Sequence, residues 1–112
     1  MITATFIRKG SRIVGFESEG HAGYADYGSD IVCAAVSAIL ITAANGLCAV
    51  VGIEPTVRQN DEVGFLKVDL PDCLGEAQLH DAGLVLEVAE QGLRSIAEQY
   101  PGNVRVISRN RR

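Results

Sequence analysis

The sequence predicts an α+β fold with the element order ββαββαβ, in which a mainly antiparallel sheet packs with two long helices. Residues 2–8 and 12–18 alternate in polarity on either side of a turn at Gly10, as in a β-hairpin. Residues 31–52 form a long apolar segment, and residues 76–99 carry apolar side chains every three or four positions. Hairpins that alternate with helices favour this fold class.

Length and composition indicate one folded unit. The chain has 112 residues, of which 47% are hydrophobic and 21% charged, so we expect a single globular domain over residues 1–112. The net charge of -4 argues against a general nucleic-acid binder and against direct binding of nucleic acid as a requirement. Basic side chains nevertheless crowd the end of the chain. We interpret them as a solvated tail, the alternative being a phosphate-contacting arm: Arg105, Arg109, Arg111 and Arg112.

The three cysteines indicate a reducing compartment. Their odd number and irregular spacing, together with the lack of a signal-peptide pattern, favour free thiols and a cytoplasmic location. Cys48 lies deep in the first helical segment, so we expect it to pack in the core, and Cys73 is assigned no function. His and Cys residues do not cluster at zinc spacing, so the sequence offers no zinc site.

The first helix is predicted over residues 31–52, with Asp30 as its N-cap and with Gly52 and Pro55 ending it. The apolar stretch is long enough to span a bilayer. Because it is rich in alanine and lies between strand-like segments, we instead expect a buried helix of a soluble protein, partly covered by sheet or by a second subunit, with no membrane partner.

The second half repeats the plan of two strands and a helix. Strands are predicted over residues 56–59 and 64–70, and the chain ends in a short strand over residues 104–108. The helix over residues 76–99 presents one apolar stripe, which we interpret as its core face: Leu79, Ala82, Leu86, Ala89, Leu93, Ile96 and Tyr100.

His21 and Cys33 are the candidate catalytic pair. His21 follows a strand and Cys33 lies in the first turn of a helix, so both border the same loop. A helix N-terminus favours a thiolate, the reactive form of cysteine. A neighbouring imidazole takes the thiol proton and later protonates a leaving amine. The free amides of the first turn are expected to hold an oxyanion. The alternative for Cys33 is a small core residue.

Two further side chains are candidates for supporting roles. Asp30 caps the helix, which by itself explains its presence, and it also has the position to orient His21. Ser37 lies four residues after Cys33 on the same helix face, where it bonds either within the site or to its own backbone. The glycine-bearing loop before the helix is predicted to be mobile and to close on an extended peptide, through Ala22, Gly23, Tyr24, Tyr27 and Gly28.

The stretch from Gly20 to Ser37, GHAGYADYGSDIVCAAVS, closely resembles the signature of the bacterial ribosomal-processing cysteine proteases, the Prp family. Length and element order agree with that family, so the resemblance covers essentially the whole chain. It implies an endopeptidase that removes a short N-terminal extension, ending in a hydrophobic, aromatic-containing stretch, from large-subunit ribosomal protein number twenty-seven. It also implies Cys33 as nucleophile, His21 as base, a homodimer, and no metal or cofactor.

Two other functions are compatible with the residues. A non-enzymatic ribosome-assembly or ribosome-binding factor would use the basic C-terminus. A thiol redox protein has little support, since the sequence contains no CxxC motif and no evident resolving cysteine.

Overall fold

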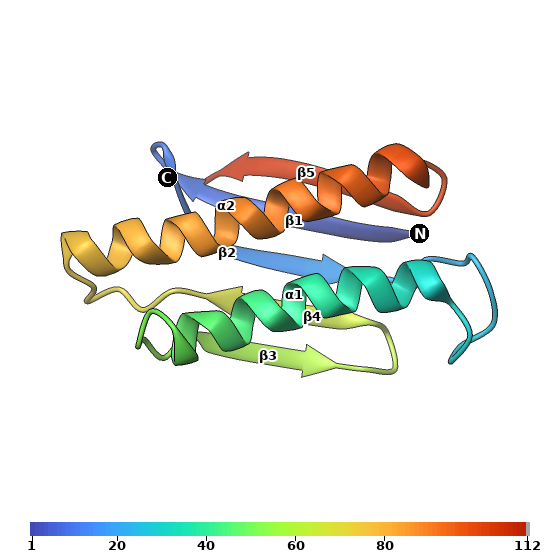
Figure 1. Cartoon of the computed structure of the whole chain (residues 1–112), viewed down its shortest axis with the longest axis horizontal. Helices are drawn as coiled ribbons and strands as arrows, with labels where there is room; N and C mark the ends of the chain where they lie inside the picture. The colour runs from blue at the N-terminus through green and yellow to red at the C-terminus, as the bar shows by residue number, and fades with distance from the viewer. Residues whose placement is uncertain (112) are drawn as a thin grey trace.

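Two helices cover one face of a five-stranded sheet in the computed structural model, which describes residues 1–111 (Figure 1). The sheet order is β3-β4-β2-β1-β5, with β5 parallel to β1 and every other pair antiparallel. This confirms the predicted α+β class and the mainly antiparallel sheet. The elements are β1 (Ile2–Lys9), β2 (Arg12–Glu19), α1 (Ile31–Ala49), β3 (Thr56–Asn60), β4 (Phe65–Asp69), α2 (Glu76–Gln99) and β5 (Val104–Asn110).

The β1–β2 hairpin supplies the centre of the core. Phe6 pairs with Phe16 across the two strands, and their rings lie 5.8 Å apart in a tilted arrangement. Both side chains are fully buried beneath the helices. A central pair of aromatic side chains on one sheet face stabilises the pairing and fixes which face the helices cover.

Helix α1 is less buried than the sequence suggests. It ends at Ala49 rather than at residue 52, because the amides of Val50 and Val51 both turn back to the carbonyl of Gly46. Its core face is a single stripe made by Val32, Val36, Leu40, Ala43 and Leu47. The rest of its surface is not covered within one copy of the chain, and the expectation that Cys48 packs in the core is wrong, because Cys48 is exposed.

Helix α1 is also the one helix within residues 1–111 that is long and apolar enough to cross a membrane, judged by length and composition only. The core helix of a soluble protein passes the same test, so this observation is weak evidence. In the structure the helix packs on the sheet through its buried stripe.

The apolar stripe of α2 forms its core face, as predicted. Four of its residues are buried, and the other three pack against the core at its edge. On the same side of the helix lies a charged residue, Glu90, which is only 4% exposed. A buried carboxylate requires compensation by charges or hydrogen bonds.

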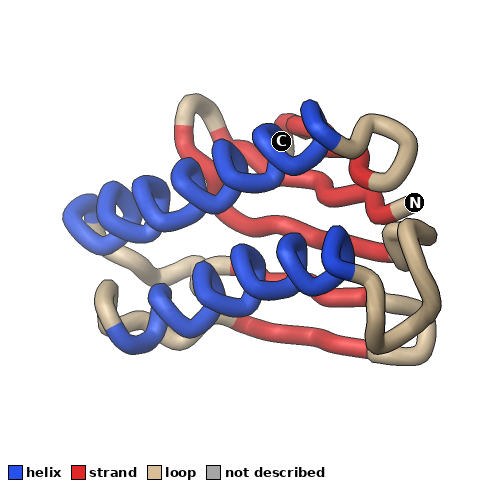
Figure 2. Tube along the Cα trace, turned by 45° about the vertical axis from the view of Figure 1, so that its right-hand side comes forward, coloured by secondary structure: helices blue, strands red, loops and turns tan. Residues whose placement is uncertain are grey.

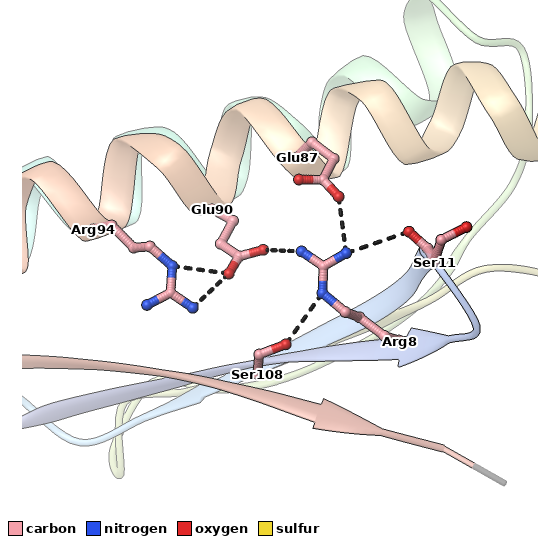
Figure 3. A network of polar contacts seen from close by, with 6 residues as sticks. All are labelled: Arg8, Ser11, Glu87, Glu90, Arg94 and Ser108. Atoms are coloured by element: carbon pink, nitrogen blue, oxygen red, sulfur yellow. Dashed lines mark hydrogen bonds and ion pairs between the residues drawn. The ribbon is translucent and has the colours of Figure 1, made fainter.

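A polar network across α2, β1 and β5 provides that compensation (Figure 3). The guanidinium of Arg8 donates to Glu87 at 2.9 Å and to Glu90 at 2.7 Å, and its Nε donates to Ser108 at 3.1 Å. Arg94 donates twice to the other oxygen of Glu90, at 2.9 and 2.6 Å. The hydrogen bond from Arg8 to Glu87 is the main cause of the raised pKa of Arg8. The network ties α2 to both neighbouring strands.

The basic side chains near the C-terminus lie mostly on β5. Arg105 and Arg109 are exposed on this edge strand, and the backbone amide of Arg111 bonds to the carbonyl of Arg8. Arg109 lies 3.9 Å from Glu17 of β2. Part of the expected solvated tail is thus strand; Arg112 lies outside the described residues.

One end of the molecule gathers the segments that carry the candidate site. The loop after β2, the N-terminal end of α1 and the β3–β4 turn lie together there, as both views show (Figures 1 and 2). Antiparallel pairing of β4 with β2 and β3 brings the β3–β4 turn to the end of β2, where His21 follows. The topology therefore assembles the site from three separate stretches of sequence.

Candidate active site

Cys33 and His21 line the same two adjoining cavities. The first, of about 180 Å³, lies between α1, the end of β2 and the β3–β4 turn. The second, of about 550 Å³, lies between α1 and the loop after His21. Ser37 and Tyr27 also line both cavities. Cys33 is half-buried and His21 exposed, so a peptide has access to both side chains.

Asp30 is the N-cap of α1 and also anchors the preceding loop. One carboxylate oxygen accepts from the amides of Val32 and Cys33, at 3.0 and 2.9 Å. The other accepts from the amides of Tyr24 and Ala25, at 2.9 and 3.2 Å. These bonds, first the one from Cys33, hold the pKa of Asp30 below its ordinary value. Within residues 1–111 its carboxylate makes no hydrogen bond to His21, so the expected orienting contact is absent.

Three first-turn amides of α1, which we expected to hold an oxyanion, are already paired in the structure. Val32 and Cys33 donate to the Asp30 side chain, and Ala34 donates to the Asp30 carbonyl. An amide that donates to a carboxylate is not available to a substrate oxygen without losing that bond. Oxyanion stabilisation at this helix end therefore requires either the amide of Ile31, which has no partner within residues 1–111, or a donor outside the first turn.

We expect Asp30→Asn to release the loop but keep the helix cap. The amide oxygen of asparagine still accepts from Val32 and Cys33, whereas its NH₂ group cannot accept from Tyr24 and Ala25. Hydrogen exchange followed by NMR should show faster exchange of the Tyr24 and Ala25 amides and unchanged protection at Val32 and Cys33. Equal loss of protection at all four amides would contradict this division of roles.

The same substitution carries a pH signature. Because the pKa of Asp30 is lower in the folded than in the unfolded state, the stabilisation by its carboxylate is complete above the unfolded pKa. It is lost as the pH falls through the folded pKa. Protection of the Tyr24 and Ala25 amides in the wild type should therefore decrease below about pH 4. In Asp30→Asn it should stay low and independent of pH across that range.

His21 contacts the backbone of the β3–β4 turn, and both of its chain neighbours are hydrogen-bonded to distant segments. Its Nε2 lies 3.4 Å from the carbonyl oxygen of Glu62 in the β3–β4 turn. A carbonyl oxygen only accepts hydrogen bonds, so this contact favours the tautomer with the proton on Nε2 and leaves the lone pair on Nδ1. The amide of Gly20 donates to Val63 at 3.3 Å, and the side chain of Asn103 donates to the carbonyl of Ala22 at 2.9 Å.

Gly64 is the closest-packed point of this support. Its φ is +62°, and an added Cβ would overlap the carbonyl oxygen of Gly20 and lie 3.1 Å from Cε1 of His21. A left-handed backbone with no room for a side chain requires glycine. Sequence reasoning missed Gly64, Glu62 and Asn103, because their role arises only from pairing between distant segments. The only local signal was the glycine after an Asn-Asp-Glu turn.

We expect Gly64→Ala to displace His21 and to lower peptidase activity by at least about tenfold. Gly10→Ala is the matched control, because Gly10 has a similar φ of +65° but open space around it. Both variants carry the cost of a left-handed alanine, about 1 kcal/mol. Kinetics measured below the melting temperatures of both variants separate the loss of activity caused by displacement of His21 from this loss of stability. Equal activity in the two variants would show that the packing against His21 is immaterial.

The loop residues divide into two groups. Gly23, Tyr27 and Gly28 line the larger cavity, and the Tyr27 ring, 84% exposed, lies edge-on to His21 with centroids 6.1 Å apart. Ala22 instead packs in the core, and the ring of Tyr24 lies edge-on to that of Tyr100, with ring centroids 5.4 Å apart. These last two residues thus fix the first part of the loop rather than line either cavity.

The remaining thiols and histidine lie away from these cavities. Cys48 and Cys73 are exposed, and so is His80, which lies beside Asp81. Within residues 1–111 no group of three or more His, Cys, Asp or Glu side chains is placed to hold a metal ion.

Comparison with known proteins assigns the chain to a family. The family model described as cysteine protease Prp matches residues 1–105. The chain therefore belongs to the Prp family of cysteine proteases. The ribosomal processing cysteine protease Prp of Bacillus subtilis is 34% identical over 109 residues, covering 96% of this chain and 97% of its own. Membership in a protease family excludes the non-enzymatic binding factor as the main function.

Solved structures extend the Prp assignment to the fold. An essential ribosomal processing protease Prp from S. aureus, in complex with a covalently linked product peptide, matches with a TM-score of 0.87 and 27% identity, over 97% of this chain and 100% of that one. A protein from Streptococcus mutans matches with a TM-score of 0.87 and 31% identity, over 99% of this chain and 96% of that one. The Prp fold thus includes both the loop and the helix end that form the candidate site.

Proposed function

We propose that this protein is an endopeptidase that removes the N-terminal extension of large-subunit ribosomal protein number twenty-seven, with Cys33 as nucleophile and His21 as base. The observation that carries the proposal is the shared lining: one thiol and one imidazole, from different elements, face the same two cavities. The ribosomal processing named in the B. subtilis and S. aureus relatives supports the substrate class.

The positions of the two side chains support a thiolate mechanism. Cys33 lies in the first turn of α1, where the helix dipole favours the anion, although the Asp30 carboxylate opposes it. Nδ1 of His21 takes the thiol proton in the tautomer that the Glu62 carbonyl favours. The imidazolium then protonates the amine leaving group, and water hydrolyses the acyl-enzyme.

The test is cleavage of a synthetic peptide that spans the extended N-terminus of the ribosomal protein from the same organism. Mass spectrometry should find one cut, after the hydrophobic, aromatic-containing stretch. A peptide of the same composition in scrambled order is the control and should stay intact. Absence of a cut in the authentic peptide, with folded protein confirmed by circular dichroism, would overturn the substrate assignment.

We also propose a homodimer that forms through the helical layer. Helix α1 carries no charged side chain and lies beside α2 with an apolar groove of about 690 Å³ between them. Leu84 and Val88 on the groove edge are 54% and 72% exposed. A contiguous apolar patch rimmed by polar residues is typical of a protein interface.

We propose a cytoplasmic location, which fits both the free thiols and a substrate made in the cytoplasm.

Val88→Asp should convert the dimer to a monomer, because it places a charge in the apolar groove. Sedimentation velocity of the wild type should give about twice the monomer mass of 11.9 kDa, and the variant should sediment as a monomer. Gln78→Asp, on an exposed turn of α2 outside the groove lining, should stay dimeric. A monomeric wild type at tens of micromolar would contradict the proposal.

A further inference from the structure

We propose that the hydroxyl of Ser37 donates a hydrogen bond to the oxyanion that forms when Cys33 attacks the peptide carbonyl. The proposal rests on the proposed role of Cys33 as nucleophile. It adds a catalytic residue with a defined task, since Ser37 would contact the reacting oxygen itself.

The pairing of the helix amides favours a side-chain donor. In many thiol and serine hydrolases backbone amides at a helix N-terminus stabilise the oxyanion. Here the amides of Val32 and Cys33 donate to the Asp30 carboxylate, which retains its charge at neutral pH. To use them, a substrate would have to break the charge-assisted hydrogen bonds that cap the helix. Within residues 1–111 the amide of Ile31 is the one first-turn donor without a partner.

Ser37 has the position and the free proton that the task needs. It lies one helical turn after Cys33, and residues four apart on a helix have Cβ atoms about 5–6 Å apart. It lines both cavities together with Cys33 and His21. Within residues 1–111 its hydroxyl makes no hydrogen bond. By contrast, Ser95 on α2 donates back to the carbonyl of Gln91 at 3.2 Å, the common arrangement for a helical serine.

The chemical step uses these groups without a further reactant. The Cys33 thiolate forms a bond to the carbonyl carbon, and the carbonyl π electrons move to the oxygen, which becomes the anion that Ser37 stabilises. The C–N bond then breaks as the C=O bond re-forms, and His21 supplies the proton to the departing amine. His21, now neutral, takes a proton from the water that attacks the thioester, and a second oxyanion forms at the same place. As this oxyanion collapses the C–S bond breaks, the acid is released, and the Cys33 thiolate regains its proton from His21.

Two reactions of Cys33 separate this role from a structural one. Peptide cleavage passes through an oxyanion, whereas alkylation by iodoacetamide displaces iodide and forms none. Ser37→Ala should lower kcat for the ribosomal-protein peptide by roughly a hundredfold, with KM changed less than about twofold. The rate of Cys33 alkylation should stay within about twofold of the wild type. Ser37→Thr, which retains the hydroxyl, should recover most of the lost kcat.

Ile31→Pro tests the remaining amide. Proline is favoured at the first position of a helix and lacks an N–H, and the extended backbone of Asp30 accepts a following proline. This variant should retain kcat. A normal kcat in Ser37→Ala with a low kcat in Ile31→Pro would overturn the proposal and assign the oxyanion to the amide. Alkylation that slows in parallel with cleavage in Ser37→Ala would also overturn it. Failure of the wild type to cut the peptide would instead refute the function on which the proposal rests.

Discussion

Cys33→Ala is expected to abolish cleavage of the ribosomal-protein peptide, with a loss of at least about four orders of magnitude in kcat. The reason is chemical, since no other nucleophile of comparable strength lines the two cavities. The cost to the free energy of unfolding should be small, within about 1 kcal/mol, because Cys33 is only partly buried at the edge of the core. Mass spectrometry of the peptide and thermal unfolding measure the two effects separately.

Cys48→Ala is the matched control for that experiment. Cys48 belongs to the same helix and is exposed, outside the lining of both cavities, so removing its thiol should leave activity unchanged. Isothermal titration should also show that Cys33→Ala still binds the peptide, since the cavities persist. Undiminished turnover by Cys33→Ala, from a preparation free of wild-type enzyme, would refute the assignment of the nucleophile.

Glu90→Ala should destabilise the fold by about 2–4 kcal/mol, which lowers the melting temperature by roughly 10–20 °C. The side chain of Glu90 is 6% exposed and joins Arg8 of β1 to Arg94 of its own helix (Figure 3). Without it, the part-buried guanidinium of Arg8 keeps Glu87 and Ser108 but loses its shortest hydrogen bond. Removing one member of a buried ionic network is costly because the others remain charged.

Glu87→Ala distinguishes the contribution of the exposed partner of Arg8, Glu87, from that of its buried partner, Glu90. Glu87 also bonds to Arg8, but its side chain is 43% exposed, so its loss should cost less than about 1 kcal/mol. Glu90→Gln should fall between the two alanine variants, since it keeps the shape and one acceptor but not the charge. Chemical denaturation gives the three values, and equal effects of Glu87→Ala and Glu90→Ala would contradict a special role for the buried site.

Local sequence determined the elements of this fold because their signals are short-range. The strand alternation around Gly10, the Asp30 cap and the stripe of the second helix each depend on residues within a few positions. The structure confirms these elements, with boundaries shifted by a few residues. The signature from Gly20 to Ser37 was also sufficient to identify the family, which the family model bears out.

The apolar composition of α1 was a poor guide to how much of the helix is buried. The apolar content of α1 suggested a buried helix and a packed Cys48, but one layer of sheet covers only one stripe of a helix. The exposed remainder of its surface is also apolar, and this is why we propose a dimer there.

The surroundings of the candidate site were decided by the tertiary structure alone. His21 receives its support from Glu62, Gly64 and Asn103, which the sheet pairing brings from distant parts of the chain. Whether a helix amide is free depends on the direction in which a neighbouring side chain points, and the Asp30 carboxylate points at two of them. The sequence by itself thus indicated the candidate residues for the chemistry. Their orientation, and the hydrogen bonds left open to a substrate, followed from long-range packing, because such contacts have no signal in local sequence.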